Sequence, residues 1–290
     1  MKYDISIILF LVSLFLISQV VGLSLIYEDA KIRMGPGGEK EVVHGETVLG
    51  PRPEIYGFKS FLWLLGGIGI STLIILAIVW LKKVNWWKAL YYTSAFLTIA
   101  LALGTVFDSL VAYILALIIL VIKVYKPSFI VHNIAQILMC AGIAILLVPL
   151  FDLKWAIALL LVISAYDFFA VYKSKHMVKM ALFQAKSKLF AGISIPLSSV
   201  KGKKRKIKGA IIGGGDVAFP LIFSGVVMES LMRMPQLTKE AAFLRVLIIP
   251  LLVSLTLLFL LIKGREGKFY PGMPFITAAC LLGYFLVVFV

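Results

Sequence analysis

Two aspartates lie deep inside long apolar stretches of this 290-residue chain. Asp216 follows three consecutive glycines, 213–215, in the apolar run 209–232, and Asp167 lies in the preceding run, within Ile-Ser-Ala-Tyr-Asp-Phe-Phe. A carboxylate in an apolar run long enough to cross a bilayer is energetically costly, so its presence predicts a functional site. Eleven of the 14 acidic residues lie in loops or at the ends of such runs, and the other three are this pair and Glu229.

The two aspartates lie at similar distances from one basic connection. Asp167 is six residues before Lys173, and Asp216 is eight residues after Lys208, which corresponds to about 9 and 12 Å along a helix. If their helices are antiparallel neighbours, both carboxylates lie at one level just below the cytoplasmic face. Glu229, 13 residues after Asp216, lies about 20 Å further along the same helix and is expected to be a solvated helix end.

Two close carboxylates in apolar surroundings do not both ionise easily, so the pair shares one proton. This state suits hydrolysis of a peptide bond, because one carboxylate takes a proton from water while the other donates to the carbonyl oxygen. The three glycines before Asp216 remove side chains where a substrate backbone would approach. Pro220 removes a backbone donor and is expected to kink the helix after Asp216.

The last apolar run opens with Tyr270-Pro271-Gly272-Met273-Pro274. Two prolines three residues apart predict an extended segment or a turn instead of helix interior. The segment is expected at the level of the aspartates, where its backbone could pair with an unwound substrate.

The composition predicts an integral membrane protein. The chain is 61% hydrophobic, against about 45–50% in soluble domains, and its mean hydropathy is +1.04. Nine runs have roughly the 20 residues of a membrane-crossing helix, the first being too long for a signal peptide. The predicted fold is therefore an all-α polytopic membrane protein with nine transmembrane helices. The runs are 5–27, 60–81, 89–107, 109–125, 129–150, 153–172, 209–232, 241–262 and 270–290.

The net charge of +15 comes from basic residues concentrated in alternate loops, and this pattern indicates the orientation of the chain in the membrane. Eleven of the 29 basic residues lie in 173–208, which has no acidic residue, and smaller basic clusters follow the second, fourth and eighth runs. The positive-inside rule places these loops in the cytoplasm, with the N-terminus cytoplasmic and the C-terminus external. Attraction to anionic lipid explains the basic loop better than binding of nucleic acid, which is not expected.

The chain divides into three predicted regions. Residues 1–172 carry six transmembrane helices with Asp167 on the sixth, residues 173–208 form the basic cytoplasmic loop, and residues 209–290 carry three further helices with Asp216 on the seventh. Within the loop, the alternating residues 190–197 predict a short edge strand or flap near the site. The external segment 28–60 is expected to hold at most a short ordered stretch.

Other chemically active residues predict no second centre. Cys140 and Cys280 lie inside predicted helices, which indicates neither a disulfide framework nor a zinc cluster, and no His-Glu-x-x-His motif is present. No metal or other cofactor is therefore expected. His132, Asn133 and Gln136 in the fifth run are expected to bond across helices, as polar side chains in membranes usually do.

The motifs Tyr166-Asp167, Gly213-Gly214-Gly215-Asp216 and Pro271-Gly272-Met273 resemble the Tyr-Asp, Gly-x-Gly-Asp and Pro-Ala-Leu motifs of the presenilin and signal peptide peptidase family. The resemblance covers essentially the whole chain and implies a nine-helix intramembrane aspartyl protease, similar to archaeal presenilin-like homologues. It implies that Asp167 and Asp216 are the catalytic pair, although Gly272 and Met273 replace the family's Ala and Leu. The residues expected to contact substrate are Tyr166, Gly213, Gly215, Pro271, Gly272, Met273 and Pro274.

Other classes of membrane protein also fit a pair of buried aspartates. Prepilin peptidases also use a Gly-x-Gly-Asp aspartate but have fewer spans, and a proton-coupled transporter or channel would use buried carboxylates for relay. A hydrogen-bonded helix clamp is the structural alternative. For the protease, the expected partners are transmembrane-helix substrates and membrane lipids in the cell membrane. No obligatory accessory subunit is expected, and oligomerisation is left open.

Overall fold

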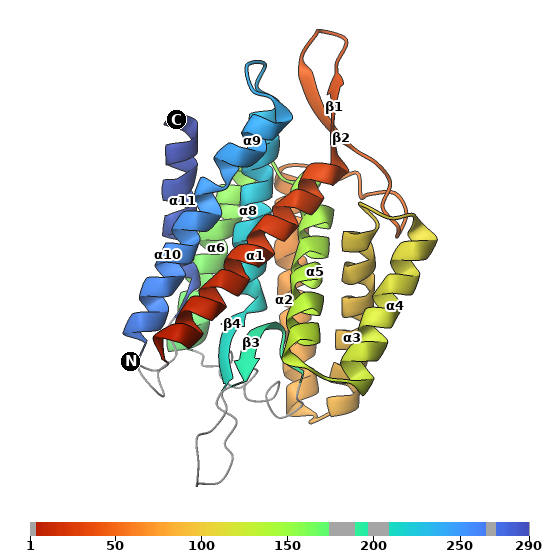
Figure 1. The fold of residues 1–290 in the computed structure, drawn as a ribbon, viewed down its shortest axis with the longest axis vertical. Coiled ribbons are helices and arrows are strands. Elements are labelled where there is room, and N and C mark those ends of the chain that lie inside the picture. The colour runs from red at the N-terminus through yellow and green to blue at the C-terminus, as the bar shows by residue number, and fades with distance from the viewer. Residues whose placement is uncertain (1–3, 174–188, 197–208, 265–270, 290) are drawn as a thin grey trace.

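The computed structural model describes residues 4–173, 189–196, 209–264 and 271–289. It is a mostly helical bundle in which successive long helices run up and down, with one β-hairpin at each end (Figure 1). The helices are α1 (Ile5–Asp29), α2 (Phe58–Trp80), α3 (Val84–Leu103), α4 (Ser109–Tyr125), α5 (Phe129–Leu147), α6 (Leu153–Tyr172), α8 (Gly214–Met232), α9 (Lys239–Val246), α10 (Ile248–Lys263) and α11 (Met273–Phe289), with a short 3₁₀ turn, η1 (Val148–Leu150), after α5.

The bundle is that of a polytopic membrane protein. Within the described ranges, six helical stretches are long and apolar enough to cross a membrane: α1, α2, α5 with η1, α6, α8, and α9 with α10. Helices α4 and α11 are shorter apolar helices. Each predicted apolar run contains a described helix, and α4 and α6 have the predicted bounds.

The prediction of an all-α fold is wrong in its detail, because two antiparallel hairpins are present. Strand β1 (Ala30–Met34) pairs with β2 (Lys40–His44), and β3 (Gly192–Pro196) pairs with β4 (Gly209–Gly213). The seventh run therefore begins as a strand, and its helix starts only at Gly214. Glycine disfavours helix interior, and the backbone of this glycine-rich stretch finds its partner in β3, as the edge-strand prediction for 190–197 suggested.

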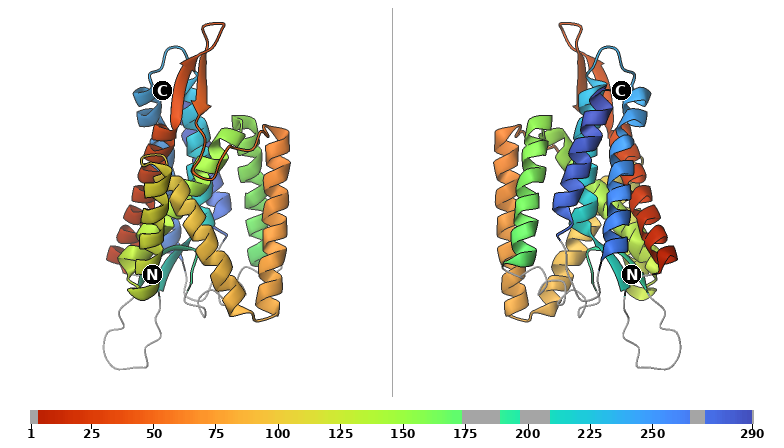
Figure 2. Two further views of the ribbon diagram at one scale, coloured as in Figure 1. Left: turned by 90° about the vertical axis from the view of Figure 1, so that its right-hand side faces the viewer. Right: turned by 90° about the vertical axis from the view of Figure 1, so that its left-hand side faces the viewer.

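Helix α8 is the centre of the bundle. Buried residues make up 78% of its most apolar stretch, compared with 6% in α2. It contacts α1, α5, α6, α10 and α11, whereas α2 lies at the edge of the molecule beside α6 (Figure 2). A Cβ atom added to Gly22 of α1 would collide with the side chain of Leu221, so glycine is what lets α1 pack closely on α8. The element that carries Asp216 is thus the most enclosed.

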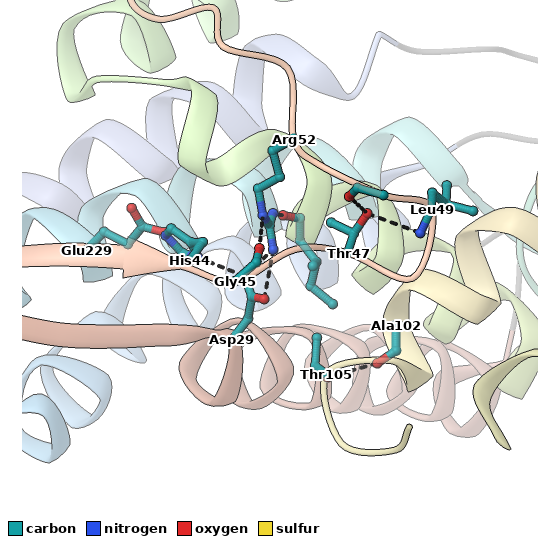
Figure 3. A network of polar contacts seen from close by, with 11 residues as sticks. Asp29, His44, Gly45, Thr47, Leu49, Arg52, Ala102, Thr105 and Glu229 are labelled. Atoms are coloured by element: carbon teal, nitrogen blue, oxygen red, sulfur yellow. Dashed lines mark hydrogen bonds and ion pairs between the residues drawn. The ribbon is translucent and has the colours of Figure 1, made fainter. Parts of the chain in front are cut away.

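The C-terminal end of α8 is linked to the hairpin β1–β2 by buried charges (Figure 3). His44 Nδ1 lies 2.7 Å from Asp29 Oδ2, and His44 Nε2 lies 3.0 Å from Glu229 Oε1. Arg52 Nη2 lies 2.7 Å from Asp29 Oδ1. Glu229 is only 2% exposed, so the prediction of a solvated helix end is wrong: the loop after α1 folds back and covers it. We call Asp29, His44, Arg52 and Glu229 the outer clasp.

The outer clasp gives the stability of the protein a dependence on pH. Burial opposes the charged form of His44, but the contacts with Asp29 and Glu229 outweigh it and raise the pKa of His44 to about 9. A histidine with a raised pKa stabilises the fold fully below its unfolded value of about 6.5 and loses this contribution as pH rises through 9.

We therefore predict that the melting temperature in detergent falls between pH 7.5 and pH 10. The loss corresponds to up to about 2 kcal/mol, or roughly 4–8 °C. His44→Gln should be less stable at pH 7.5 and show a flatter profile over the same range. Equal slopes for the two proteins would show that His44 does not carry a proton in the clasp.

Candidate active site

Asp167 is held by the first turn of another helix. It lies on α6, is 4% exposed, and its Oδ2 accepts a hydrogen bond of 3.1 Å from the backbone N–H of Met273. The backbone N–H of Gly272 also donates to this carboxylate. These N–H groups belong to the start of α11, where no carbonyl in the helix is available to them. A helix N-terminus stabilises an anion, so α11 is oriented to hold Asp167.

The contact between α6 and α11 is reinforced one turn deeper. Ser164 donates to the hydroxyl of Thr277 at 2.9 Å, and that hydroxyl lies 3.3 Å from the carbonyl oxygen of Leu160. Both hydroxyls lie within one helical turn of the contact between Asp167 and Met273, so the two helices are in register at the carboxylate.

Asp216 lies in the first turn of its own helix. Gly213 is the N-cap of α8, and its backbone N–H donates to the Asp216 carboxylate. This is half of a capping box, in which the third helical residue reaches back to the N-cap. A Cβ atom added to Gly213 would lie 3.1 Å from Asp216 Oδ2. The glycine before the helix therefore leaves room for the carboxylate to turn inward.

The two carboxylates converge on one residue, Gly272. Its N–H is bonded to Asp167, and a Cβ atom added to it would lie 3.3 Å from Asp216 Oδ1. The two carboxylates also interact electrostatically. The sequence argument that Asp167 and Asp216 meet near one end of adjacent helices is thus matched by the structure.

The proline-rich segment differs from its sequence prediction. Pro271 and Gly272 are non-helical, but α11 already begins at Met273, so Pro274 lies in its first turn, where the missing N–H costs nothing. The Gly272 carbonyl accepts from Phe275 at 3.2 Å and Ile276 at 3.1 Å. Both backbone groups of Gly272 are therefore used inside the protein, so the backbone pairing with substrate that was predicted for this segment does not involve Gly272.

The remaining predicted residues lie around this centre. Tyr166 precedes Asp167 on α6 and is half-buried, whereas Gly215 is exposed. A Cβ atom added to Gly215 would meet only the Phe219 ring, at 3.5 Å. Tyr270 and most of the loop 173–208 lie outside the described residues.

Several polar residues outside the predicted site support it. Gln19 of α1, fully buried, donates at 2.8 Å to the carbonyl of Val217, the residue after Asp216. Pro220, at which the sequence predicted a kink, lies inside the continuous helix α8. His132 and Asn133 of α5 bond the backbone of β3, whereas the sequence predicted bonds between helices. The available signal was their polarity inside apolar runs; their partners follow only from the fold.

The described residues contain no group of three or more His, Cys, Asp or Glu side chains that could hold a metal ion. What the arrangement offers is two interacting carboxylates beside backbone N–H groups, in a site enclosed by α6, α8 and α11. This is suited to acid–base activation of a water molecule.

Fold and site together define a polytopic helical membrane protein with paired aspartates on neighbouring helices. A family model described as signal-peptide peptidase, presenilin aspartyl protease matches residues 61–290. The chain therefore belongs to this family and is an intramembrane aspartyl protease, a hydrolase, which confirms the resemblance seen in its motifs. A comparison with curated proteins returned no match.

Two solved structures of a presenilin family intramembrane aspartate protease resemble the fold. The structure in space group C222 has a TM-score of 0.59 and 17% sequence identity, covering 97% of this chain and 98% of that chain. The structure in space group P2 has a TM-score of 0.56 and 20% identity, covering 96% of each chain. At these identities the likeness concerns the fold.

The limited space beside Gly213 predicts that a larger residue there will reduce activity. In Gly213→Ala, the new methyl group displaces the Asp216 carboxylate by a few tenths of an ångström. We expect kcat to fall by about tenfold, because small displacements of catalytic groups are costly, with little change in melting temperature. The control is Gly69→Ala on α2, where nothing lies within 4 Å of the added atom. Wild-type cleavage by Gly213→Ala would show that Asp216 needs no such room.

Proposed function

We propose that Asp167 and Asp216 are the catalytic dyad and that they hydrolyse peptide bonds within transmembrane segments of substrate proteins. The observation that carries this proposal is the convergence of both carboxylates on Gly272. Hydrogen bonds from two backbone N–H groups favour the ionised form of a carboxylate. Asp167 receives such bonds from Gly272 and Met273, so the shared proton resides on Asp216.

The reaction then proceeds in two steps, each with two proton transfers. Asp167 takes a proton from the attacking water as the C–O bond forms, and Asp216 gives its proton to the substrate carbonyl oxygen. In the second step, Asp167 passes its proton to the departing amide nitrogen, and the tetrahedral hydroxyl returns a proton to Asp216 as the C–N bond breaks. The products are a carboxyl group and an amine, and the dyad is restored.

Substrate binding is assigned to the residues around this pair. Gly215 leaves the face of α8 next to Asp216 free of side-chain bulk, and Tyr166 lies beside Asp167 on α6. Gly213 and residues 271–274 complete the set. The backbone groups of Gly272 are already hydrogen-bonded within the protein. This segment therefore contacts the substrate by van der Waals packing, while its N–H groups hold Asp167. A substrate helix enters laterally from the membrane and unwinds here.

The first experiment is cleavage of a helical membrane substrate by wild type, Asp167→Asn and Asp216→Asn in detergent. Asparagine preserves the shape of each side chain but cannot exchange the proton. We expect both variants to keep a native melting curve and to lose at least about 10³-fold in kcat, as expected when a catalytic acid or base is removed. Persistent cleavage by either folded variant would remove that residue from the chemistry.

We further propose that the chain crosses the cell membrane nine times, α9 and α10 acting as one span. The N-terminus is then cytoplasmic and the C-terminus external. The opposite placement of the two ends of the chain in the bundle (Figure 1) supports this arrangement, as does the basic segment 173–208. The outer clasp and the hairpin β1–β2 then face outward.

Cysteine labelling in whole cells tests this orientation. Gly37→Cys, at the tip of the β1–β2 hairpin, should react with a membrane-impermeant maleimide in intact cells. Lys83→Cys, between α2 and α3, should react only after permeabilisation. The native Cys140 and Cys280 are buried and should contribute little labelling. The reverse pattern would invert the proposed topology.

A further inference from the structure

Helix α5 presents polar side chains to strand β3. The His132 ring nitrogen Nε2 lies 2.9 Å from the carbonyl oxygen of Gly192. Asn133 donates from Nδ2 to the Ser194 carbonyl at 2.9 Å, and its Oδ1 accepts from the Ser194 N–H at 3.0 Å. Asn133 is 3% exposed. One buried side chain thus satisfies both backbone groups of one strand residue.

These bonds use the edge of β3 that faces away from β4. In a strand, the backbone groups of alternate residues point to opposite edges. Gly192 and Ser194 face α5, whereas the carbonyl of Ala191 faces the other edge and accepts from the N–H of Gly214 at 3.0 Å. An asparagine amide offers one donor and one acceptor side by side, as a peptide group does. The Asn133 side chain therefore takes the place of a third strand.

The position of β3 is transmitted directly to Asp216. The register pairs Ser194 with Ile211 and Gly192 with Gly213, the N-cap of α8. A Cβ atom added to Gly192 would collide with the carbonyl oxygen of Ile212, so this part of β3 lies directly against β4 with no room for a side chain. A displacement of β3 along α5 would therefore displace the Gly213–Asp216 turn.

We propose that Asn133 is a positioning residue for proteolysis: by pairing with Ser194 it fixes β3 against α5, and the β3–β4 register then sets the place of Asp216. His132 supports the same edge through Gly192. The inference rests on the proposed role of Asp216 in catalysis. Asn133 acts on the reaction through the hairpin and touches no reacting atom.

Two variants remove the contact from opposite sides. Asn133→Leu has nearly the same size but offers neither a donor nor an acceptor. Ser194→Pro removes the N–H whose hydrogen bond Asn133 accepts; this N–H lies on the strand edge that faces away from β4, so the hydrogen bonds between β3 and β4 are kept. The matched control is Ser194→Ala, which keeps both backbone groups and changes only the side chain.

The experiment measures kcat, KM and melting temperature for these variants on one transmembrane substrate. Asn133→Leu and Ser194→Pro should each lower kcat by about tenfold or more, since catalytic groups are sensitive to small displacements, with KM within about twofold of wild type. Ser194→Ala should match wild type. The double variant should lose no more than either single variant, because both remove one interaction.

Other outcomes have distinct meanings. Folded Asn133→Leu with wild-type kcat overturns the inference, and so does equal loss in Ser194→Ala, which would implicate the hydroxyl. If Asn133→Leu does not fold, Ser194→Pro decides; if neither folds, Asn133 is a purely structural residue and the inference fails. Wild type that cleaves no better than Asp216→Asn would refute the proposed function itself.

Discussion

The contact between Asp167 and the start of α11 is the interaction on which the site depends. A carboxylate enclosed among membrane helices is unfavourable unless donors surround it, and the first N–H groups of a helix need an acceptor. Hydrogen bonds from the backbone N–H groups of Gly272 and Met273 to Asp167 supply both the donors and the acceptor. This contact joins the start of α11 to α6, and Gly272, beside it, also lies next to Asp216.

Helix α8 is fixed at both of its ends by different means. At its N-terminal end, β4 leads directly into Gly213 and Asp216, and strand β3 holds β4 in register. At its C-terminal end, Glu229 lies in the outer clasp with His44. Between them the helix is almost entirely buried, while α2 packs on few neighbours. The packing is therefore densest around the helix that carries Asp216 and sparsest around α2.

Much of the site could be predicted from the sequence because burying a charge in a membrane is costly. That cost singles out Asp167 and Asp216 without any structure, and the basic segment between them places both near one face. The apolar runs predicted the helices within a few residues, since membrane length fixes helix length. The run 209–232 was predicted as one helix because hydropathy does not distinguish a buried strand from a buried helix.

The sequence by itself determined the class of fold and singled out the pair of carboxylates, because these follow from local hydropathy and charge. Only the tertiary structure decided which groups satisfy the buried polar atoms. Nothing in the order of residues indicated that Asn133 would pair with Ser194, that Glu229 would meet His44, or that Gly272 would be bonded to Asp167. These partners are 61, 185 and 105 positions apart in the printed sequence, and a hydrogen bond is satisfied by proximity in space, which only the packing of the helices creates.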